Sequence, residues 1–403
     1  MKQEATTDTR NARALWACYG GMMCVAVSSN LPAIYLTTFG ETFGGPGGLN
    51  EEQLGRIPGV VFAAFVLGIV VSGPLADRWG GKLFAMLGLA LTVVGLCLFA
   101  AAPNYGALLA AAAVMGVAAG VLDMVLSPIV SALRPNARGS ALNWLHSFYC
   151  IGALGVVMIG SGAIHWGISW RAVSLALAAV PTVLLLLFST LTIPALVHQD
   201  AVRMPLRGLL REPFFLAALL AIALAGATEQ GMAQWVPAFT ERGLGYSKTI
   251  GALSLAGFSF GMIAGRMTAA MIQQRIRAIP MMIGGCVLSV LLFLVACFYA
   301  NPPVALAACI LVGFSGSCLW PTTLAVTANR CPHGGATMFA LLSAAGNGGC
   351  FVMAWLVGIV AMYSHLNLGL ATTALCPAVL VFVLVWMGAR GVAGGTADSG
   401  SGE

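Results

Sequence analysis

The sequence is poor in charge. Asp, Glu, Lys and Arg make up only 8% of its 403 residues, whereas hydrophobic residues make up 59%. A soluble domain carries about 25% charged residues, so this composition excludes a soluble globular protein. The apolar residues form continuous runs of helix length and do not alternate with polar ones, which also excludes a membrane β-barrel. We therefore expect an all-α integral membrane protein in contact with the lipid bilayer.

The patterns that mark enzymes and metal sites are also missing. The sequence has no CxxC pair and no HExxH. Its single GxSxG string, residues 257–261, lies inside an apolar run of helix length and not at a strand-to-helix turn, so it is no nucleophile elbow. Nearly all of the 11 cysteines lie inside apolar runs, where buried thiols are the usual interpretation. Cys331-Pro332-His333 is too short a cluster to indicate a metal site. We expect no enzyme, no cofactor and no metal; a membrane sensor would usually add a soluble output domain, which this sequence does not contain.

Twelve apolar runs are long enough to cross a bilayer as helices. They cover residues 14–40, 54–76, 83–102, 105–133, 138–164, 170–194, 213–240, 248–273, 278–300, 303–329, 335–363 and 366–389. The first run is too long for the core of a signal peptide, so we expect it to be retained. The longest break leaves six runs on each side. We predict a cytoplasmic N-terminal segment at 1–13 and two six-helix bundles at 14–194 and 213–390. A cytoplasmic linker at 195–212 joins the bundles, and a Gly/Ser-rich disordered tail follows at 391–403.

Basic residues concentrate in alternate loops, so the net charge of +6 is a topology signal and does not indicate nucleic-acid binding. One side of the membrane would hold both termini and most of the Lys and Arg. The other side would hold only Arg56, Arg171, Arg242 and Lys248. By the positive-inside rule both termini are cytoplasmic, and we expect the protein in the bacterial cytoplasmic membrane.

The two halves of the chain repeat. One spacing separates Gly68 from Gly261, Gly120 from Gly313 and Pro128 from Pro321, and a slightly longer one separates Pro32 from Pro237. Collinear small residues and prolines indicate two six-helix halves related by a parallel repeat, with a site between them near the membrane midplane. This is the architecture of a transporter.

The string GPLADRWGGK, residues 73–82, falls between the second and third helices. Its glycines permit a tight turn and close helix approach, and its acid suits a helix N-terminus. An ordinary charged cytoplasmic loop is the alternative. The string resembles the signature loop of the major facilitator superfamily at Gly73, Leu75, Asp77, Arg78, Gly80 and Lys82. The resemblance implies twelve helices in two halves and a gating role for the loop, above all for Asp77 and Arg78.

Asp123 stands in the middle of the fourth apolar run, with no Lys or Arg within ten residues. A carboxylate at this depth costs roughly 2.5–3.5 kcal/mol on insertion scales, so it faces protein or water and indicates a functional site. Ser127 lies on the same helical face, and Gly116 and Gly120 lie near it. The next helix brings together on one stripe a second set of polar and small residues, Asn143, His146, Ser147 and Cys150.

These two helices resemble the fucose–glucose–proton symporter subfamily. The matching residues are Gly116, Asp123, Pro128, Leu142, Asn143, His146, Phe148 and Gly152, together with Trp320-Pro321-Thr322 and Gly346-Asn347-Gly348-Gly349. Ser127 stands where the subfamily pattern has Asn. The subfamily's acid in the first helix has no counterpart, because Ser28-Ser29-Asn30-Leu31-Pro32 occupies that place. The resemblance therefore implies that proton coupling rests on Asp123.

Glu229 is the other acid in the middle of a helix, and Gln230 and Gln234 share a face beside it. We expect Glu229 to face the cavity, although a solvated position near the external end is the alternative. One of the acids Asp123 and Glu229 would carry the proton and the other would bind substrate. His146 could relay a proton, bind substrate or simply pack. The tryptophans, which could stack on a sugar or anchor at the interface, are Trp144, Trp235, Trp320 and Trp355.

No Lys or Arg is expected in the middle of the membrane. Arg266 stands at the end of the eighth run, where we interpret it as part of a degenerate second copy of the signature loop. Binding of anionic substrates generally needs such a cation, so the sequence disfavours them.

We predict a monomeric secondary transporter that works by alternating access and couples protons to the symport of a small neutral polar solute such as a monosaccharide. A proton/drug antiporter that exports amphipathic or cationic compounds is the alternative. Asp123 and Glu229 are the predicted proton-coupling residues. The predicted substrate-binding residues are Asn30, Asn143, His146, Gln230, Gln234, Trp235, Trp320 and Asn347, and the predicted gating residues are Gly73, Asp77, Arg78, Gly80 and Lys82.

Overall fold

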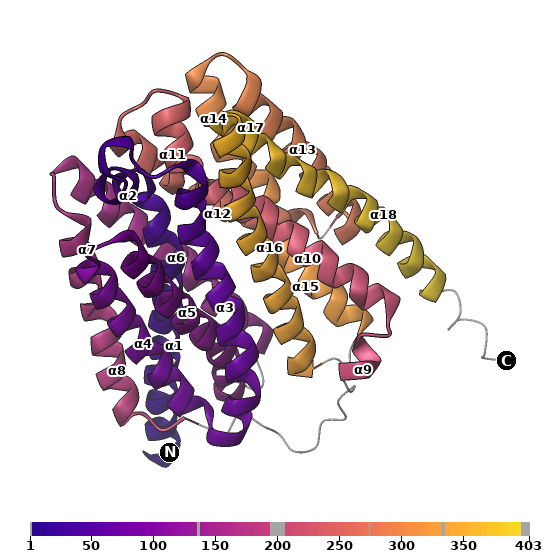
Figure 1. Cartoon of the computed structure of the whole chain (residues 1–403). Coiled ribbons are helices and arrows are strands. Elements are labelled where there is room, and N and C mark those ends of the chain that lie inside the picture. The colour runs from indigo at the N-terminus through magenta and orange to yellow at the C-terminus, as the bar shows by residue number, and fades with distance from the viewer. Residues whose placement is uncertain (1, 135–137, 194–205, 274, 332–334, 396–403) are drawn as a thin grey trace. The chain divides into compact units, whose positions relative to one another are not determined.

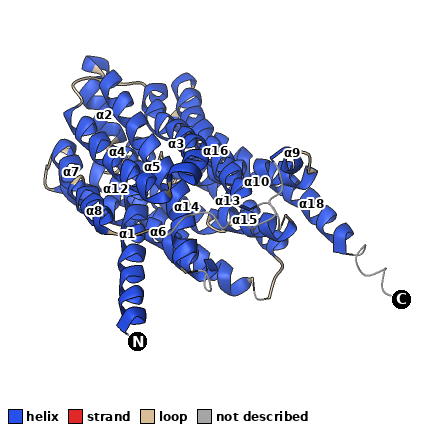
Figure 2. Ribbon diagram, turned by 90° about the horizontal axis from the view of Figure 1, so that it is seen from below, coloured by secondary structure: helices blue, strands red, loops and turns tan. Residues whose placement is uncertain are grey.

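The structure is a computed structural model that describes residues 2–134, 138–193, 206–273, 275–331 and 335–395. Within these ranges the chain is helical and contains no strand (Figure 2). Twelve of its helical segments are long and apolar enough to cross a membrane. The predicted all-α architecture with twelve spans is therefore confirmed, and the protein is a multi-pass membrane protein.

Eight α-helices form the first six spans, and Figure 1 labels them in chain order from α1 to α8. The third of these helices carries residues 73–79 of the signature string, and the fifth carries the mid-helix aspartate. The elements are α1 (Lys2–Ile34), α2 (Leu36–Phe43), the short 3₁₀ turn η1 (Gly45–Gly47), α3 (Glu51–Trp79), α4 (Gly81–Ala101), α5 (Tyr105–Leu133), α6 (Arg138–His165), α7 (Trp170–Leu177) and α8 (Ala179–Thr190).

The second six spans contain more interruptions, two of which lie beside prolines that the repeat identified. The elements are α9 (Leu206–Leu209), α10 (Pro213–Ala233), α11 (Val236–Ala238), the π-helical turn η3 (Phe239–Gly243), α12 (Lys248–Ile272), α13 (Ala278–Phe298), α14 (Pro302–Gly316), α15 (Leu319–Arg330), α16 (Gly335–Tyr363), α17 (Leu366–Ala371), the 3₁₀ turn η4 (Thr372–Ala374) and α18 (Leu375–Gly395).

Asparagine side chains begin several of the spans. Asn104 accepts a hydrogen bond from the backbone N–H of Ala107 at the start of α5, and Asn301 accepts one from Val304 at the start of α14. Each cap satisfies one of the backbone donors that a helix N-terminus leaves without a partner. The fourth and tenth spans, which correspond in the sequence repeat, thus begin in the same way.

The contacts divide the chain into two compact units. The first contains Met1–Ala201 with Pro237–Ala256, and the second contains Val202–Val236 with Gly257–Glu403. The segment of the second half that joins the first unit carries α11, η3 and the beginning of α12. Each unit is described by itself below.

Glycines that match in the repeat make matching helix crossings. In the first unit, a Cβ atom at Gly120 of α5 would lie 2.1 Å from the carbonyl oxygen of Phe65 in α3. In the second unit, a Cβ atom at Gly313 of α14 would lie 2.4 Å from the carbonyl oxygen of Phe258 in α12. Small residues let two backbones approach this closely. The repeat that the sequence predicts is therefore present as the same crossing in both units.

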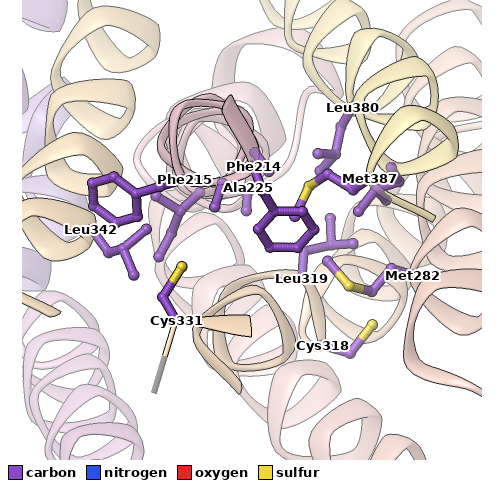
Figure 3. Close-up of a cluster of buried hydrophobic side chains, with 14 of the residues drawn as sticks. Phe214, Phe215, Ala225, Met282, Cys318, Leu319, Cys331, Leu342, Leu380 and Met387 are labelled. Carbon is purple, nitrogen blue, oxygen red and sulfur yellow. The ribbon is translucent and has the colours of Figure 1, made fainter. Parts of the chain in front are cut away.

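The second unit has an apolar core of buried side chains (Figure 3). Phe214 and Phe215 at the start of α10 project into it, and Met282, Leu319, Leu342 and Met387 approach from four other helices. These side chains are almost fully buried. Because α10 is packed on this side by so many apolar partners, its orientation in the unit is fixed, and so is the face that carries its polar residues.

Gly120→Ala should destabilise the protein, because the new methyl group would meet backbone atoms that cannot move aside. Overpacking of this kind costs about 1–3 kcal/mol, which thermal unfolding in detergent would detect. The matched control is Gly155→Ala in α6, where the added Cβ would have nothing within 4 Å. Equal melting temperatures for the two variants would contradict the close crossing.

Candidate functional site

In the first unit, α5 presents Asp123 with its side chain partly buried. In the described part of the chain, its carboxylate forms no ion pair and accepts no hydrogen bond from another side chain. The helix runs on without a break through Pro128 to Leu133. Asp123 is thus an acid without a charged partner among the described residues, in a span whose neighbouring positions are mostly buried and apolar. Its role in proton coupling stays a prediction.

The stripe predicted on the next helix is only partly described. His146 and Ser147 are exposed in the isolated chain and Cys150 is half-buried, while Trp144 is 59% exposed. Asn143 lies in α6, but its side chain falls outside the described residues. The structure therefore leaves the predicted roles of Asn143 and His146 as predictions.

Asn30 is buried in α1, and its amide nitrogen donates to the carbonyl oxygen of Ala26 at 2.9 Å. Ser29 makes the same kind of bond with its hydroxyl, to Val25 at 3.1 Å. Two of the polar side chains that replace the expected acid of the first helix, Ser29 and Asn30, therefore bond to their own helix. The role of Asn30 in substrate binding stays a prediction.

The signature string forms the junction of α3 and α4. The string remains helical to Trp79, and Gly80 then adopts a φ of 91°, a conformation that favours glycine. Lys82 donates from Nζ to the carbonyl oxygen of Ser189 at 2.8 Å, near the end of α8, where the helix dipole favours a cation. Arg78 is exposed, and the side chain of Asp77 is outside the described residues. The junction is short, and its lysine joins a third helix.

The second unit carries a polar group on α10. Gln230 donates to Oε1 of Glu229 at 3.2 Å, and Gln234 donates to Oε1 of Gln230 at 2.8 Å. Glu229 also lies 3.7 Å from the guanidinium of Arg266 in α12. The two side chains are 12% and 29% exposed, respectively. Sequence reasoning brought together three of these residues and missed Arg266.

That Arg266 belongs to a second copy of the signature loop stays a prediction. Arg266 lies inside α12, six residues before the end of the helix, which is about 9 Å along the axis. What sequence reasoning did not foresee is that Arg266 lies within this candidate span and pairs there with Glu229. Two features of the sequence could have revealed the pair: Glu229 and Arg266 are opposite charges inside neighbouring apolar runs of the same half, and neither has another opposite charge close to it in sequence.

The tryptophans of the second unit differ in what they can contact. Trp235 is fully buried, and its indole N–H donates to the carbonyl oxygen of Ala354 at 2.9 Å, so its ring presents no free face in this conformation. Trp320 is only partly buried. Its ring fills the space above Gly226 and Gly346, where an added Cβ would approach ring carbons to 2.9 and 2.2 Å. Of the two, Trp320 is the one that could stack on a solute.

Asn347 follows Gly346 on α16 and is 7% exposed. Its amide nitrogen donates to the carbonyl oxygen of Ser343 at 2.9 Å. This bond fixes the orientation of the amide group on the helix that packs against α10.

Comparison with known proteins identifies the family. The sequence model of the Major Facilitator Superfamily matches residues 17–354. The chain belongs to this superfamily. This MFS transporter is 22% identical over 336 residues to an uncharacterized MFS-type transporter of Yersinia pestis, a match that covers 81% of this chain and 85% of that protein.

Two sugar transporters are also similar to this MFS transporter. The galactose-proton symporter of Escherichia coli (strain K12) is 32% identical over 132 residues, which are 32% of this chain and 28% of the symporter. The crystal structure of the E. coli fucose:proton symporter, FucP, aligns with a TM-score of 0.66 and 19% identity over 93% of this chain and 98% of that chain. The latter similarity establishes the fold.

Sequence reasoning also missed a group of polar links at one end of the first unit. Thr37 donates to Oε2 of Glu241 at 2.6 Å, Lys248 pairs with Glu41, and Arg242 lies 3.6 Å from Glu51. Each link joins residues about 200 positions apart in the chain. The sequence identifies several of these charges only as topology markers, because no local spacing reveals such pairs.

Thr37 belongs to the first half of the sequence and Glu241 to the second, and alternating access would move the two halves relative to each other. Joining Thr37 to Glu241 covalently should therefore stop transport by this MFS transporter. A Thr37→Cys/Glu241→Cys variant, with the incompletely buried Cys97, Cys150 and Cys376 replaced by Ser, would be treated with a short bifunctional thiol reagent. We expect loss of solute flux after treatment and recovery on reduction. The two single-cysteine variants are the controls. Full flux in the cross-linked protein would mean that this end need not open.

Proposed function

We propose that this MFS transporter is a proton-coupled symporter of a small neutral polar solute such as a monosaccharide. It would work by alternating access in the bacterial cytoplasmic membrane, as a monomer with both termini in the cytoplasm. The observation that carries the proposal is the contrast between its two acids within spans: Asp123 has no charged partner in the described part of the chain, whereas Glu229 has Arg266.

Asp123 is the better candidate for the proton carrier. An ionised carboxylate without a counter-charge is costly away from water, and water reduces that cost when it reaches the group. Asp123 would therefore hold a proton while its surroundings exclude water and release that proton when water reaches the carboxyl group during transport. The charge of Glu229 is compensated by Arg266, so the entry of water would change the protonation of Glu229 less.

The charge balance of the second unit favours a neutral solute. Arg266 is the cation that an anionic substrate would need, and Glu229 already lies beside it. The polar side chains that remain, Gln230 and Asn347, suit hydroxyl groups, and the half-buried Trp320 offers an apolar face of the kind that packs on a sugar ring. The similarity to galactose and fucose symporters supports the same class.

The test uses purified protein in liposomes that contain a pH-sensitive dye. We expect internal acidification when one member of a panel of neutral sugars is added outside, and no response in protein-free liposomes. A panel of lipophilic cations is added separately. Proton movement with the cations alone, opposite in direction to theirs, would overturn the symport proposal and establish the antiporter alternative. Sugar uptake without proton movement would remove proton coupling from the proposal.

A further inference from the structure

The break between α14 and α15 creates an acceptor that the helix cannot satisfy. In a continuous helix the carbonyl oxygen of Ser317 would receive a hydrogen bond from the backbone nitrogen of residue 321, but Pro321 has no N–H. The backbone turns at Ser317 and Cys318 before α15 begins at Leu319. An acceptor inside a span needs a donor from elsewhere, because lipid supplies none.

Arg266 supplies that donor. Its Nε donates to the carbonyl oxygen of Ser317 at 3.4 Å. The same guanidinium is near the C-terminal end of α14, where the helix dipole favours a cation. Gly265, the preceding residue, lets α12 come close enough: a Cβ atom there would lie 2.2 Å from the carbonyl oxygen of Phe314. The proline, the glycine and the arginine thus form one local arrangement.

The other side of the guanidinium faces the carboxylate of Glu229, 3.7 Å away. Gln230 holds one oxygen of that carboxylate, and the nearest guanidinium nitrogen lies at the other oxygen. Two side chains from two helices therefore fix the orientation of the carboxylate. A carboxylate has room for about four hydrogen bonds, so acceptor capacity remains beyond these two contacts.

The ring of Trp320 lies within about one helical turn of Glu229 along α10. Gly226 lies one helical turn before Glu229 on α10, and the ring of Trp320 covers it. The apolar ring of Trp320 can pack on the apolar face of a sugar ring, and the oriented carboxylate of Glu229 can accept hydrogen bonds from the hydroxyl groups of that sugar.

We propose that Arg266 is a positioning residue, which holds the Glu229 carboxylate so that it accepts hydrogen bonds from solute hydroxyl groups beside Trp320. Glu229 then binds substrate and does not carry the coupled proton. This proposal rests on the proposed transport of a neutral hydroxyl-bearing solute. It gives the Glu229–Arg266 ion pair a function in a site whose solute has no net charge.

The test measures ligand binding separately from proton movement. Melting temperatures of the wild type and of Arg266→Lys, Arg266→Gln and Glu229→Gln/Arg266→Gln are recorded with and without each member of the sugar panel. The ligand-free melting temperature reports any structural role of the pair, and the concentration dependence of the ligand-induced increase reports affinity. We expect about ten- to one-hundredfold weaker binding in the Gln variants, from the loss of an oriented charged acceptor. Arg266→Lys should recover part of the affinity, because Lys keeps the charge without the planar fork.

The double variant keeps the proposal falsifiable, because it leaves no unpaired charge. Unchanged affinity in the double variant would overturn the proposal. So would a double variant that binds and exchanges solute normally but no longer moves protons, since Glu229 would then carry the proton. If a sugar stabilises the wild type without moving protons, the symport proposal fails and the comparison of affinities still decides the role of Arg266. If no neutral solute stabilises the wild type, the solute class and the role of Arg266 are both overturned.

Discussion

Asp123→Asn should abolish proton-driven accumulation of solute while leaving exchange of solute across the membrane. The substitution keeps the size of the side chain and resembles the protonated acid in having both a donor and an acceptor, but it cannot bind and release a proton. Solute would still bind, because in our proposal the binding carboxylate is Glu229 in the other unit. Accumulation should therefore fall to the equilibrium level, and counterflow should persist within a few-fold of the wild-type rate.

The measurement is uptake into liposomes with and without an imposed pH gradient, followed by counterflow into liposomes preloaded with unlabelled solute. Asp8→Asn is the matched control, because it removes an acid ahead of the first span, which begins at Asn11. Accumulation against a gradient in Asp123→Asn would remove Asp123 from the coupling mechanism. Loss of counterflow as well would show that Asp123 is needed for binding or for the conformational change.

Much of the fold could be predicted from the sequence, because the signals involved are local or periodic. Hydropathy marked the twelve spans, and the spacing of Gly68 and Gly120 against Gly261 and Gly313 marked the two crossings. Such a crossing can be predicted from the sequence because only a residue without a Cβ atom fits there. A Cβ atom added at Gly261 would lie 2.6 Å from the carbonyl oxygen of Ile310.

The candidate site was harder to predict, because its contacts join helices at positions that no spacing connects. The place of Arg266 near the end of an apolar run suggests only a second copy of the signature loop, whereas its partners Glu229 and Ser317 lie on two other spans. The sequence alone does not distinguish the role of Trp235 from that of Trp320. Only the packing showed that the indole of Trp235 is buried on Ala354 while that of Trp320 is partly open.

A double-mutant cycle on Glu229 and Arg266 should reveal strong energetic coupling. Arg266→Gln leaves the carboxylate without its counter-charge and leaves the carbonyl oxygen of Ser317 without its arginine donor. Glu229→Gln leaves the guanidinium beside the end of α14, whose dipole compensates it in part. We therefore expect Arg266→Gln to be the less stable single variant, with losses of about 1–3 kcal/mol for each single change.

The double variant replaces the ion pair with two neutral amides and should lose less stability than the sum of the two single changes, by about 1–2 kcal/mol. Thermal unfolding of the four proteins in one detergent gives the cycle, and Gln234→Leu, which removes the far member of the same polar group, is the control for a loss of hydrogen bonding without a change of charge. The expected order of melting temperatures has Arg266→Gln lowest, because two of its partners are uncompensated at once. If the two single losses add up in the double variant, the 3.7 Å approach of the charges contributes nothing to stability, and Arg266 would act on Ser317 alone.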